Sequence, residues 1–296
     1  MTSKVGVIGL GHMGSGMAAT LAGKGFDVSG FDLSPVALEQ ASGRGVKPVA
    51  GLDQLIKQSD VLILSLPKAE HVEAVCLGPG GILECGGEGL VVIDTTTSTP
   101  EASRNVARIL GTLGIAFIDA PVSGGPKGAA TGTLAMVIGA EDDDLARAMP
   151  VLEGISEVRV HVGKSGAGNI AKIANNLLCA AHLITTAEAV AMAARAGVAA
   201  GKLLEGINAG SGRSAASQAM FPNWVLSKAY DSGFSIGLMR KDVGLATALM
   251  DRLDLDLPLS RSVAQLWQAS SETLADQEDF CAIVQRTDAQ FYGRGE

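Results

Sequence analysis

The stretch 9-GLGHMG-14 decides the fold, because its three glycines follow an apolar strand candidate, 4-KVGVIGL-10, and precede a helix-like segment. Gly9 permits a tight turn, Gly11 a close approach of the backbone to a pyrophosphate, and Gly14 close packing of helix on strand. The helix N-terminus would then face the phosphates. A lone G-x-G-x-x-G is weak evidence, but this placement between strand and helix predicts a dinucleotide-binding loop. Its residues are Gly9, Leu10, Gly11, His12, Met13 and Gly14.

An acidic residue stands where such a loop requires one. Asp32 ends the second strand candidate, 27–32, and follows Gly11 by 21 residues. A carboxylate there accepts hydrogen bonds from a ribose diol and repels a 2′-phosphate. No arginine lies within ten residues after Asp32, and Arg44 is twelve residues on. The sequence therefore predicts NAD as the cofactor over NADP, the alternative for Asp32 being an ordinary turn residue.

The first half of the chain alternates strand and helix candidates. Near-continuous Val/Ile/Leu runs between helices are typical of a parallel sheet covered on both faces. We therefore expect an α/β protein whose residues 1–164 form a doubly wound Rossmann domain that binds NAD. The strand candidates are 4–10, 27–32, 61–67, 91–95, 115–122, 134–140 and 157–163, and the helix candidates are 13–24, 36–42, 100–113 and 142–153.

After about Lys164 the strand-like runs disappear and alanine and leucine dominate. We expect an all-α domain over 165–296 for substrate binding and oligomerisation, joined to the first by a long interdomain helix. Polar residues interrupt the apolar run 170–198, so it reads as a buried helix of a soluble protein and not as a membrane span. The helix candidates are 167–196, 200–208, 214–229, 235–254, 259–272 and 278–290.

Composition excludes several classes of function. The 296 residues are 47% hydrophobic and 18% charged, so the chain can bury a large core and is not disordered. Its net charge of -8 argues against nucleic acid or an anionic membrane as partner. The four cysteines have no metal-ligand spacing, and we expect no metal. Reduced thiols and an N-terminus unlike a signal peptide predict a cytoplasmic protein. The apolar second half favours a homodimer or homotetramer.

Two further strand ends carry polar or kinked segments, 65-SLP-67 and 94-DTTTSTP-100. Ligands of open parallel sheets bind outside the carboxyl ends of the strands. These segments could therefore line the nicotinamide half of the cofactor, although either could be merely a polar loop. The candidate residues are Leu66, Pro67, Thr96 and Thr97.

The segment 119-DAPVSGGPKGAATGTL-134 is the most unusual in the chain. Its clustered glycines let successive amides point at one anion, and Ser123 adds a hydroxyl. We expect Ser123, Gly124 and Gly125 to bind a substrate carboxylate, the alternative being a flexible glycine loop.

A polar stripe interrupts the long apolar helix at 168-GNIAKIANN-176. Asn169, Lys172 and Asn176 fall on one helical face. From this stretch alone, a solvated face with an ordinary surface lysine explains the pattern equally well.

The ordered resemblance rests on five motifs: GLGHMG, DTTTSTP, DAPVSGGPKGAATGTL, GNIAKIANN and 241-KD-242. Together they resemble the β-hydroxyacid dehydrogenases. That family includes 3-hydroxyisobutyrate dehydrogenase and tartronate semialdehyde reductase, with 6-phosphogluconate dehydrogenase as a larger relative. The resemblance covers nearly the whole chain. It is highly specific for the family and much less so for a substrate.

The resemblance implies a role for each motif. It makes Lys172 the catalytic lysine, with Asn176 one turn later, and places Thr97 beside the nicotinamide. It also makes Lys241 a cofactor-side lysine, and Ser123 to Gly125 the substrate-carboxylate loop. Thr96 stands where the family usually has serine, which keeps a hydroxyl.

The implied chemistry is an alcohol oxidation or the reverse reduction. A base must take the hydroxyl proton while a hydride leaves for the nicotinamide. A lysine at the mouth of a buried helix can do so, because burial favours its neutral form. Asn176 can orient the lysine or the substrate oxygen without adding charge.

Several alternatives stay open on the sequence. The substrate is expected to be a small 3-hydroxy acid such as 3-hydroxyisobutyrate. Tartronate semialdehyde, succinic semialdehyde, threonate and a sulfonated analogue are alternatives, and Arg213 could read a polar tail or only cap a surface turn. Imine reductases usually lack the lysine present here as Lys172. A catalytically inactive NAD-binding reader is the remote alternative.

Overall fold

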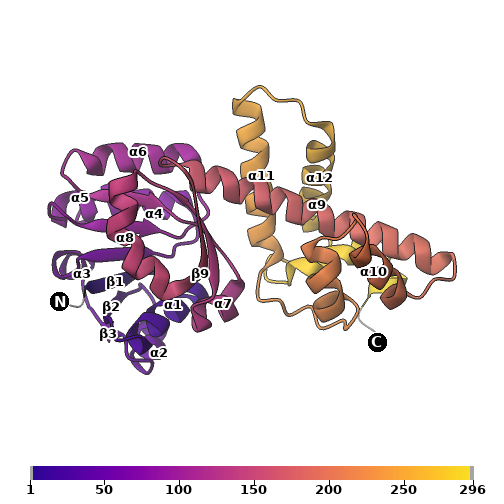
Figure 1. Ribbon diagram of the computed structural model, residues 1–296, viewed down its shortest axis with the longest axis horizontal. Coiled ribbons are helices and arrows are strands. Elements are labelled where there is room, and N and C mark those ends of the chain that lie inside the picture. Colours follow the sequence, from indigo (N-terminus) through magenta and orange to yellow (C-terminus); the bar gives the residue numbers. More distant parts are fainter. Residues whose placement is uncertain (1–2, 294–296) are drawn as a thin grey trace. The chain divides into compact units, whose positions relative to one another are not determined.

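The computed structural model describes residues 3–293, which divide into two compact units. The first unit ends at Lys172 and the second begins at Ile173. The strands of the sheet belong to the first unit, and the second is built from helices (Figure 1). The expected class, a doubly wound α/β domain followed by a helical one, is confirmed.

Within the described residues, the first unit is built on a nine-stranded sheet in the order β3-β2-β1-β4-β5-β6-β8-β7, with β9 beside β8. Strands β1 to β6 pair in parallel, whereas β8 runs antiparallel to β6 and β7. The strand order reverses at β1, and such a switch point is where open α/β sheets bind ligands. The strands are β1 (Lys4–Ile8), β2 (Asp27–Phe31), β3 (Lys47–Pro48), β4 (Val61–Leu64), β5 (Val91–Asp94), β6 (Ala116–Asp119), β7 (Val122–Ser123), β8 (Leu134–Gly139) and β9 (Ser156–Gly163).

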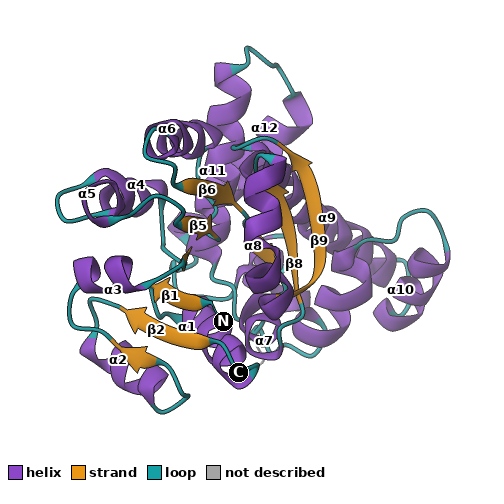
Figure 2. Cartoon of the chain, turned by 60° about the vertical axis from the view of Figure 1, so that its left-hand side comes forward, coloured by secondary structure: helices purple, strands orange, loops and turns teal. Residues whose placement is uncertain are grey.

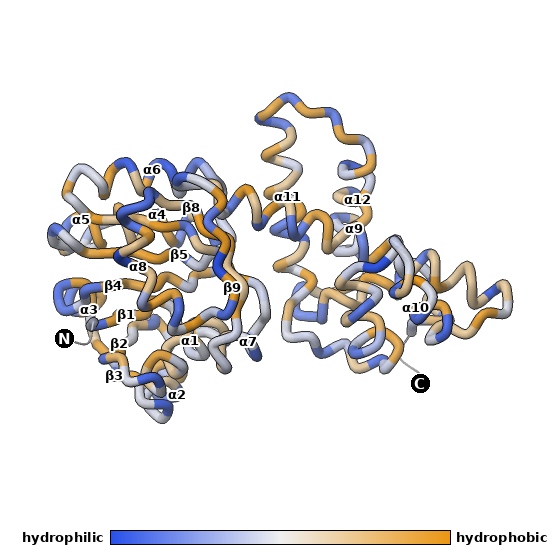
Figure 3. The backbone as a smooth tube through the Cα atoms, in the orientation of Figure 1, coloured by the Kyte–Doolittle hydropathy of each residue, from blue (hydrophilic) through white to orange (hydrophobic). Residues whose placement is uncertain are grey.

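Helices cover both faces of this sheet, which explains the continuous apolar strands (Figure 2). Along β4, Ile63 packs in the cluster with Met17 and Leu21 of α1, and Leu62 in the opposite cluster with Leu55 of α3. Figure 3 shows the resulting apolar strands in orange. The helices are α1 (His12–Gly23), α2 (Pro35–Ser42), α3 (Leu52–Gln58), α4 (Ala69–Leu77), α5 (Ile82–Cys85), α6 (Pro100–Gly111), α7 (Gly125–Thr131) and α8 (Asp142–Ile155).

Two helix starts follow the sequence closely. The side chains of Ser34 and Thr99 cap α2 and α6, accepting hydrogen bonds from the amides of Ala37 and Ala102. A proline occupies the first turn of each helix, where its missing N–H costs nothing. Both helices therefore begin at a Ser-Pro or Thr-Pro pair.

Helix α9 (Ala167–Arg195) is continuous over 29 residues. Among the described residues it is the one helix long and apolar enough to cross a membrane, a test that the core helix of a soluble protein also passes. Ala180, Leu183, Ala187 and Val190 of α9 are buried in the core of the second unit.

The second unit packs its other helices around Trp267, Phe221 and Tyr292, which are buried. The expected α-helix at 214–229 is instead a π-helix with Pro222 inside it. The expected helix at 278–290 is a 3-10 helix followed by one short α-helical turn. The elements are α10 (Ala200–Ala209), η1 (Ala216–Val225), α11 (Ile236–Arg252), α12 (Pro258–Ala269), η2 (Ser270–Glu272), η3 (Phe280–Arg286) and α13 (Ala289–Tyr292).

Candidate functional site

The three glycines of the first loop have different structural roles. A Cβ atom on Gly9 would overlap the carbonyl oxygen of Ser65, and one on Gly14 would overlap that of Gly9. Gly9 also has a positive φ of 89°. By contrast, a Cβ on Gly11 would meet nothing within 4 Å. Gly9 and Gly14 therefore shape the turn, while Gly11 leaves open space at the start of α1.

The start of α1 fits a phosphate group. Gly11 precedes the helix and supplies no side-chain cap, so the first-turn amides of His12, Met13 and Gly14 face no capping side chain. Exposed N–H groups and the helix dipole bind anions at such an end. His12 begins the helix itself, which agrees with its interpretation as a variable position of the loop.

Asp32 is tied directly to the glycine loop. Its Oδ2 accepts a hydrogen bond from the amide of Leu10 at 2.7 Å, and its Oδ1 accepts one from the amide of Ser34 at 2.7 Å. Asp32 is partly exposed, and each carboxylate oxygen keeps a further lone pair. The carboxylate thus stands at the end of β2, where it can accept hydrogen bonds from a ribose.

The loops after β4 and β5 brace each other. The Thr96 hydroxyl accepts a hydrogen bond from the amide of Leu66 at 3.1 Å, and the Thr95 hydroxyl donates to the carbonyl of Leu64 at 2.7 Å. Thr96 is buried. Its hydroxyl therefore holds the segment with Leu66 and Pro67 in place, a role that the sequence pattern did not reveal.

The structure brings Lys172 to the serine–glycine loop. Its Nζ donates a hydrogen bond to the Oγ of Ser123 at 2.8 Å. Only 8% of Lys172 is exposed, so the surface-lysine interpretation is wrong. The expected anion nest differs in detail, because Gly125 already starts the short helix α7, with Gly124 before it at a φ of 123°.

A carboxylate that sequence reasoning left without a role fixes the start of α9. Asp119 is buried at the end of β6, and it accepts hydrogen bonds from the amides of Gly166 at 2.6 Å and Asn169 at 2.9 Å. Burial raises the pKa of Asp119 to about 6, against the opposing effect of these N–H donors. In the sequence, the only indication of a role for Asp119 was its place as the first residue of the DAPVSGG segment.

In the second unit, Asn176 is part of a buried polar group. Its Nδ2 donates to the Oδ2 of Asp242 at 2.6 Å, and its Oδ1 accepts from the Nδ2 of Asn175 at 3.0 Å. The ammonium of Lys241 pairs with the Oδ1 of Asp242 at 3.2 Å. Asp242, unassigned by the sequence analysis, therefore fixes the orientation of both Asn176 and Lys241.

Two arginines of the second unit, Arg240 and Arg213, have different surroundings. Arg240 is buried and its guanidinium bonds the Ser270 hydroxyl at 2.9 Å, the Leu274 carbonyl at 2.7 Å and the Asp276 carboxylate. It therefore serves the packing of its own unit. Arg213 is exposed, and no other described residue pairs with its side chain.

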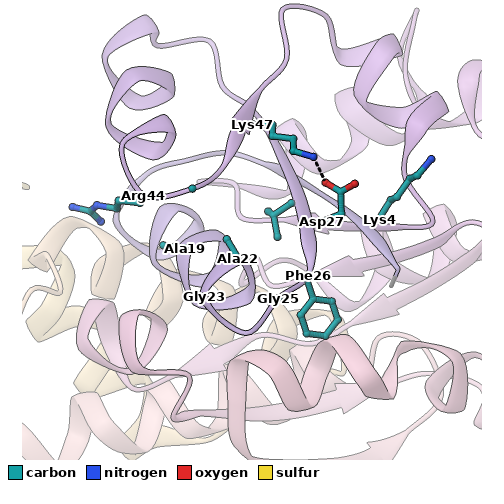
Figure 4. A pocket seen from close by; sticks show the side chains of 11 residues that line it. Lys4, Ala19, Ala22, Gly23, Gly25, Phe26, Asp27, Arg44 and Lys47 are labelled. Carbon is teal, nitrogen blue, oxygen red and sulfur yellow. Dashed lines mark hydrogen bonds and ion pairs between the residues drawn. The ribbon is translucent and has the colours of Figure 1, made fainter. Parts of the chain in front are cut away.

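A hollow of the first unit lies away from these groups. It measures about 780 Å³ and is lined by Lys4, Asp27 and Lys47, which stand at the amino ends of β1 and β2 and in β3 (Figure 4). Lys47 pairs there with Asp27 at 2.7 Å. The glycine loop follows the carboxyl end of β1, so this hollow is not the cofactor site.

Metal-binding groups are sparse in the part of the chain that the structure describes. No cluster of three or more His, Cys, Asp or Glu side chains is placed to hold a metal ion there, and the four cysteines are free thiols.

Two models of known protein families together match most of the chain. Residues 4–163 match the family model of the NAD binding domain of 6-phosphogluconate dehydrogenase. Residues 166–287 match that of the NAD-binding region of NADP-dependent 3-hydroxyisobutyrate dehydrogenase.

Individual proteins match over almost their full length. The chain is 35% identical to 3-hydroxyisobutyrate dehydrogenase of Pseudomonas aeruginosa, covering 94% of this chain and 96% of that protein. It is 34% identical to 2-(hydroxymethyl)glutarate dehydrogenase of Eubacterium barkeri, covering 95% and 93%. The solved 3-hydroxyisobutyrate dehydrogenase of Mycobacterium tuberculosis with L-serine superimposes with a TM-score of 0.90 at 32% identity, covering 97% and 100% of the two chains.

Proposed function

Because the chain belongs to the β-hydroxyacid dehydrogenase family and is an NAD(P)-dependent oxidoreductase acting on a CH–OH group, we propose that it oxidises a small 3-hydroxy acid or reduces its semialdehyde. The observation that carries this proposal is the buried Nζ of Lys172 at 2.8 Å from the Ser123 hydroxyl. It puts a proton-transferring group beside the loop proposed to bind a carboxylate.

Lys172 is the proposed general acid and base. The bound nicotinamide supplies the hydride acceptor. In oxidation, Nζ takes the proton of the substrate hydroxyl, and in reduction it returns that proton to the carbonyl oxygen. Ser123, Gly124 and Gly125 bind the substrate carboxylate in this proposal, and Asn176 orients the reacting groups. Thr97 and Lys241 act on the cofactor side.

We further propose NAD as the preferred cofactor. Asp32 supports this, because its carboxylate is held by two backbone amides at the end of β2 and carries a charge that repels a 2′-phosphate. The nearest following arginine, Arg44, lines the hollow at the amino ends of the strands and not the glycine loop.

The names of the relatives suggest a common substrate class. 3-Hydroxyisobutyrate, 2-(hydroxymethyl)glutarate and L-serine are all 3-hydroxypropanoates that differ in the substituent on carbon 2: methyl, carboxyethyl or amino. We propose a 2-substituted 3-hydroxypropanoate. Arg213, exposed and without a partner among the described residues, supports a polar or anionic substituent. Semialdehydes of longer acids and threonate remain the competing substrates.

The remaining expectations on partners and location stay proposals. A homodimer or homotetramer is supported by exposed leucines on the second unit, including Leu253, Leu259 and Leu266. Light scattering after size-exclusion chromatography tests it, and a monomer would contradict it. The free thiols and the acidic charge support a cytoplasmic protein that binds neither nucleic acid nor membrane.

The test is the rate of NAD⁺ reduction with a panel of acids. The panel holds 3-hydroxyisobutyrate, 2-(hydroxymethyl)glutarate, serine, glycerate, 4-hydroxybutyrate and threonate, each also run with NADP⁺. We expect turnover on 2-substituted 3-hydroxypropanoates, with a rate lowered on the order of 10²–10⁴ in Lys172→Ala. Lys164→Ala, which removes an exposed lysine paired with Glu141, is the matched control and should keep its activity. A clear preference for 4-hydroxybutyrate or threonate would contradict the proposed class.

A further inference from the structure

Asn169 is completely buried and its side chain joins three segments of the first unit. Its Oδ1 accepts a hydrogen bond from the amide of Ser98 at 2.8 Å, and its Nδ2 donates to the Oγ of Ser103 at 3.0 Å. Ser98 directly follows Thr97 in the loop after β5, and Ser103 lies in α6. One amide group on α9 thus bonds both the loop that carries Thr97, through its Oδ1, and helix α6, through its Nδ2.

The start of α9 is itself fixed against the sheet. The Asp119 carboxylate accepts the amides of Gly166 and Asn169, so the backbone of Asn169 is anchored as firmly as its side chain. The approach is close, because a Cβ on Gly168 would lie 2.5 Å from the carbonyl oxygen of Asp119. Asn169 therefore cannot shift along or around the helix axis without breaking these bonds.

Lys172 lies three residues after Asn169 on the same helix, one turn along and on the same face. The hydrogen bond from the Ser98 amide to Asn169 fixes the loop that carries Thr97. The Asn169 side chain therefore links the helix that carries Lys172 directly to the loop that carries Thr97.

We propose that Asn169 is a positioning residue that sets the place of the Thr97 loop relative to Lys172, through its hydrogen bond to the Ser98 amide. This inference rests on the proposed function of Lys172. In this proposal the hydrogen bond to the Ser98 amide positions the loop, whereas the hydrogen bond to Ser103 only anchors α6. Hydride and proton transfer both require reacting atoms held in place, and a misplacement of about 1 Å can cost on the order of 10²-fold in rate.

Two substitutions distinguish the effects of the two hydrogen bonds made by the Asn169 side chain. Asn169→Ala removes both hydrogen bonds, whereas Ser103→Ala removes only the one to α6. Asn105→Ala, at a partly exposed residue of α6 whose Oδ1 accepts from Arg108, is the matched control. Asn169→Ser serves if Asn169→Ala does not fold, because its short hydroxyl can bond a carbonyl of its own helix but does not reach Ser98.

The readouts are kcat, the dissociation constant of NADH, and the primary deuterium isotope effect with substrate labelled on the carbinol carbon. We expect Asn169→Ala to lower kcat by roughly 10- to 100-fold. The isotope effect should rise because hydride transfer becomes slower, and NADH affinity should change by less than about threefold. Ser103→Ala and Asn105→Ala should keep kcat within about threefold of the wild type. Equal kcat in the Asn169 and Ser103 variants would overturn the proposal.

Amide hydrogen exchange tests the tether independently of turnover. The Ser98 amide should be protected in the wild type and in Ser103→Ala, and should exchange rapidly in Asn169→Ala or Asn169→Ser. Retained protection in the Asn169 variants would overturn the inference. If the wild type itself turns over none of the acids, the proposed function fails, and the exchange result still decides whether Asn169 holds the loop.

Discussion

Asp119 makes the stability of the first unit depend on pH in an unusual direction. Its pKa is raised from 3.8 to about 6, chiefly because the carboxyl is buried. The folded protein therefore holds this proton more tightly than the unfolded chain. The contribution to stability is fully present below about pH 3.8 and is lost as the pH rises through about 6.

The size of the effect follows from the two pKa values. At 1.36 kcal/mol for each pKa unit, the gap between 3.8 and about 6 corresponds to roughly 3 kcal/mol, of which roughly 2 kcal/mol is lost between about pH 4 and pH 7. Other carboxylates titrate in the same range, so the effect must be measured as a difference. Asp119→Asn is the suitable variant, because it has nearly the same shape and no titrating proton.

The assay is urea unfolding of the wild type and Asp119→Asn at several pH values. Trp224 and Trp267 are the two tryptophans of the chain and both lie in the second unit, so their fluorescence reports that unit alone. Circular dichroism follows the unfolding of both units. An unfolding transition seen by circular dichroism but not by fluorescence therefore belongs to the first unit. We expect the stability of the wild type relative to the variant to fall by roughly 2 kcal/mol from about pH 4 to pH 7. A flat difference would refute the reasoning and show that the two N–H donors offset burial, and a difference that rises with pH would show that they outweigh it.

Three further substitutions test other parts of the account. Replacing Asp32 by serine should narrow the preference for NAD⁺ over NADP⁺ in kcat/KM by about 10-fold or more, since the charge that repels a 2′-phosphate is lost; an unchanged ratio would count against its role. Gly14→Ala should abolish NADH binding in a fluorescence titration, because the new Cβ overlaps the Gly9 carbonyl; wild-type affinity would contradict the loop geometry. Arg240→Met leaves the Ser270 hydroxyl and the Leu274 carbonyl without their guanidinium donor and should destabilise the second unit by about 1–3 kcal/mol, read by tryptophan fluorescence in urea; an unchanged free energy of unfolding would show that the guanidinium is not structurally required.

Much of the fold could be predicted from the sequence because neighbouring sequence features indicated the same structure. The glycine loop, its preceding strand and Asp32 fall where a Rossmann unit needs them, and Pro35 and Pro100 mark helix starts. The misses have local causes. The two-residue strand β3 is too short and exposed for a pattern, and the expected strand 115–122 is two strands, with Pro121, which has no N–H to donate, in the turn between them.

The candidate site was only partly predictable for a different reason. Lysine, serine and glycine carry recognisable chemistry, so Lys172 and Ser123 could be proposed from the chain, and the structure places them in contact. Asp119 and Asp242 act through partners distant in sequence, Gly166 and Asn176, and no spacing rule connects such residues. Their roles became visible only when the contacts were known.

The central claim is that Lys172 transfers the proton in the reaction. Replacing it by alanine leaves a space where a side chain only 8% exposed had stood, and a small primary amine can enter such a space. The decisive measurement is the rate of NAD⁺ reduction by Lys172→Ala, with the best acid of the panel, at increasing methylamine concentration. The account predicts a loss on the order of 10²–10⁴ in rate without amine and a partial, saturable recovery with it. An alanine variant as active as the wild type would contradict it.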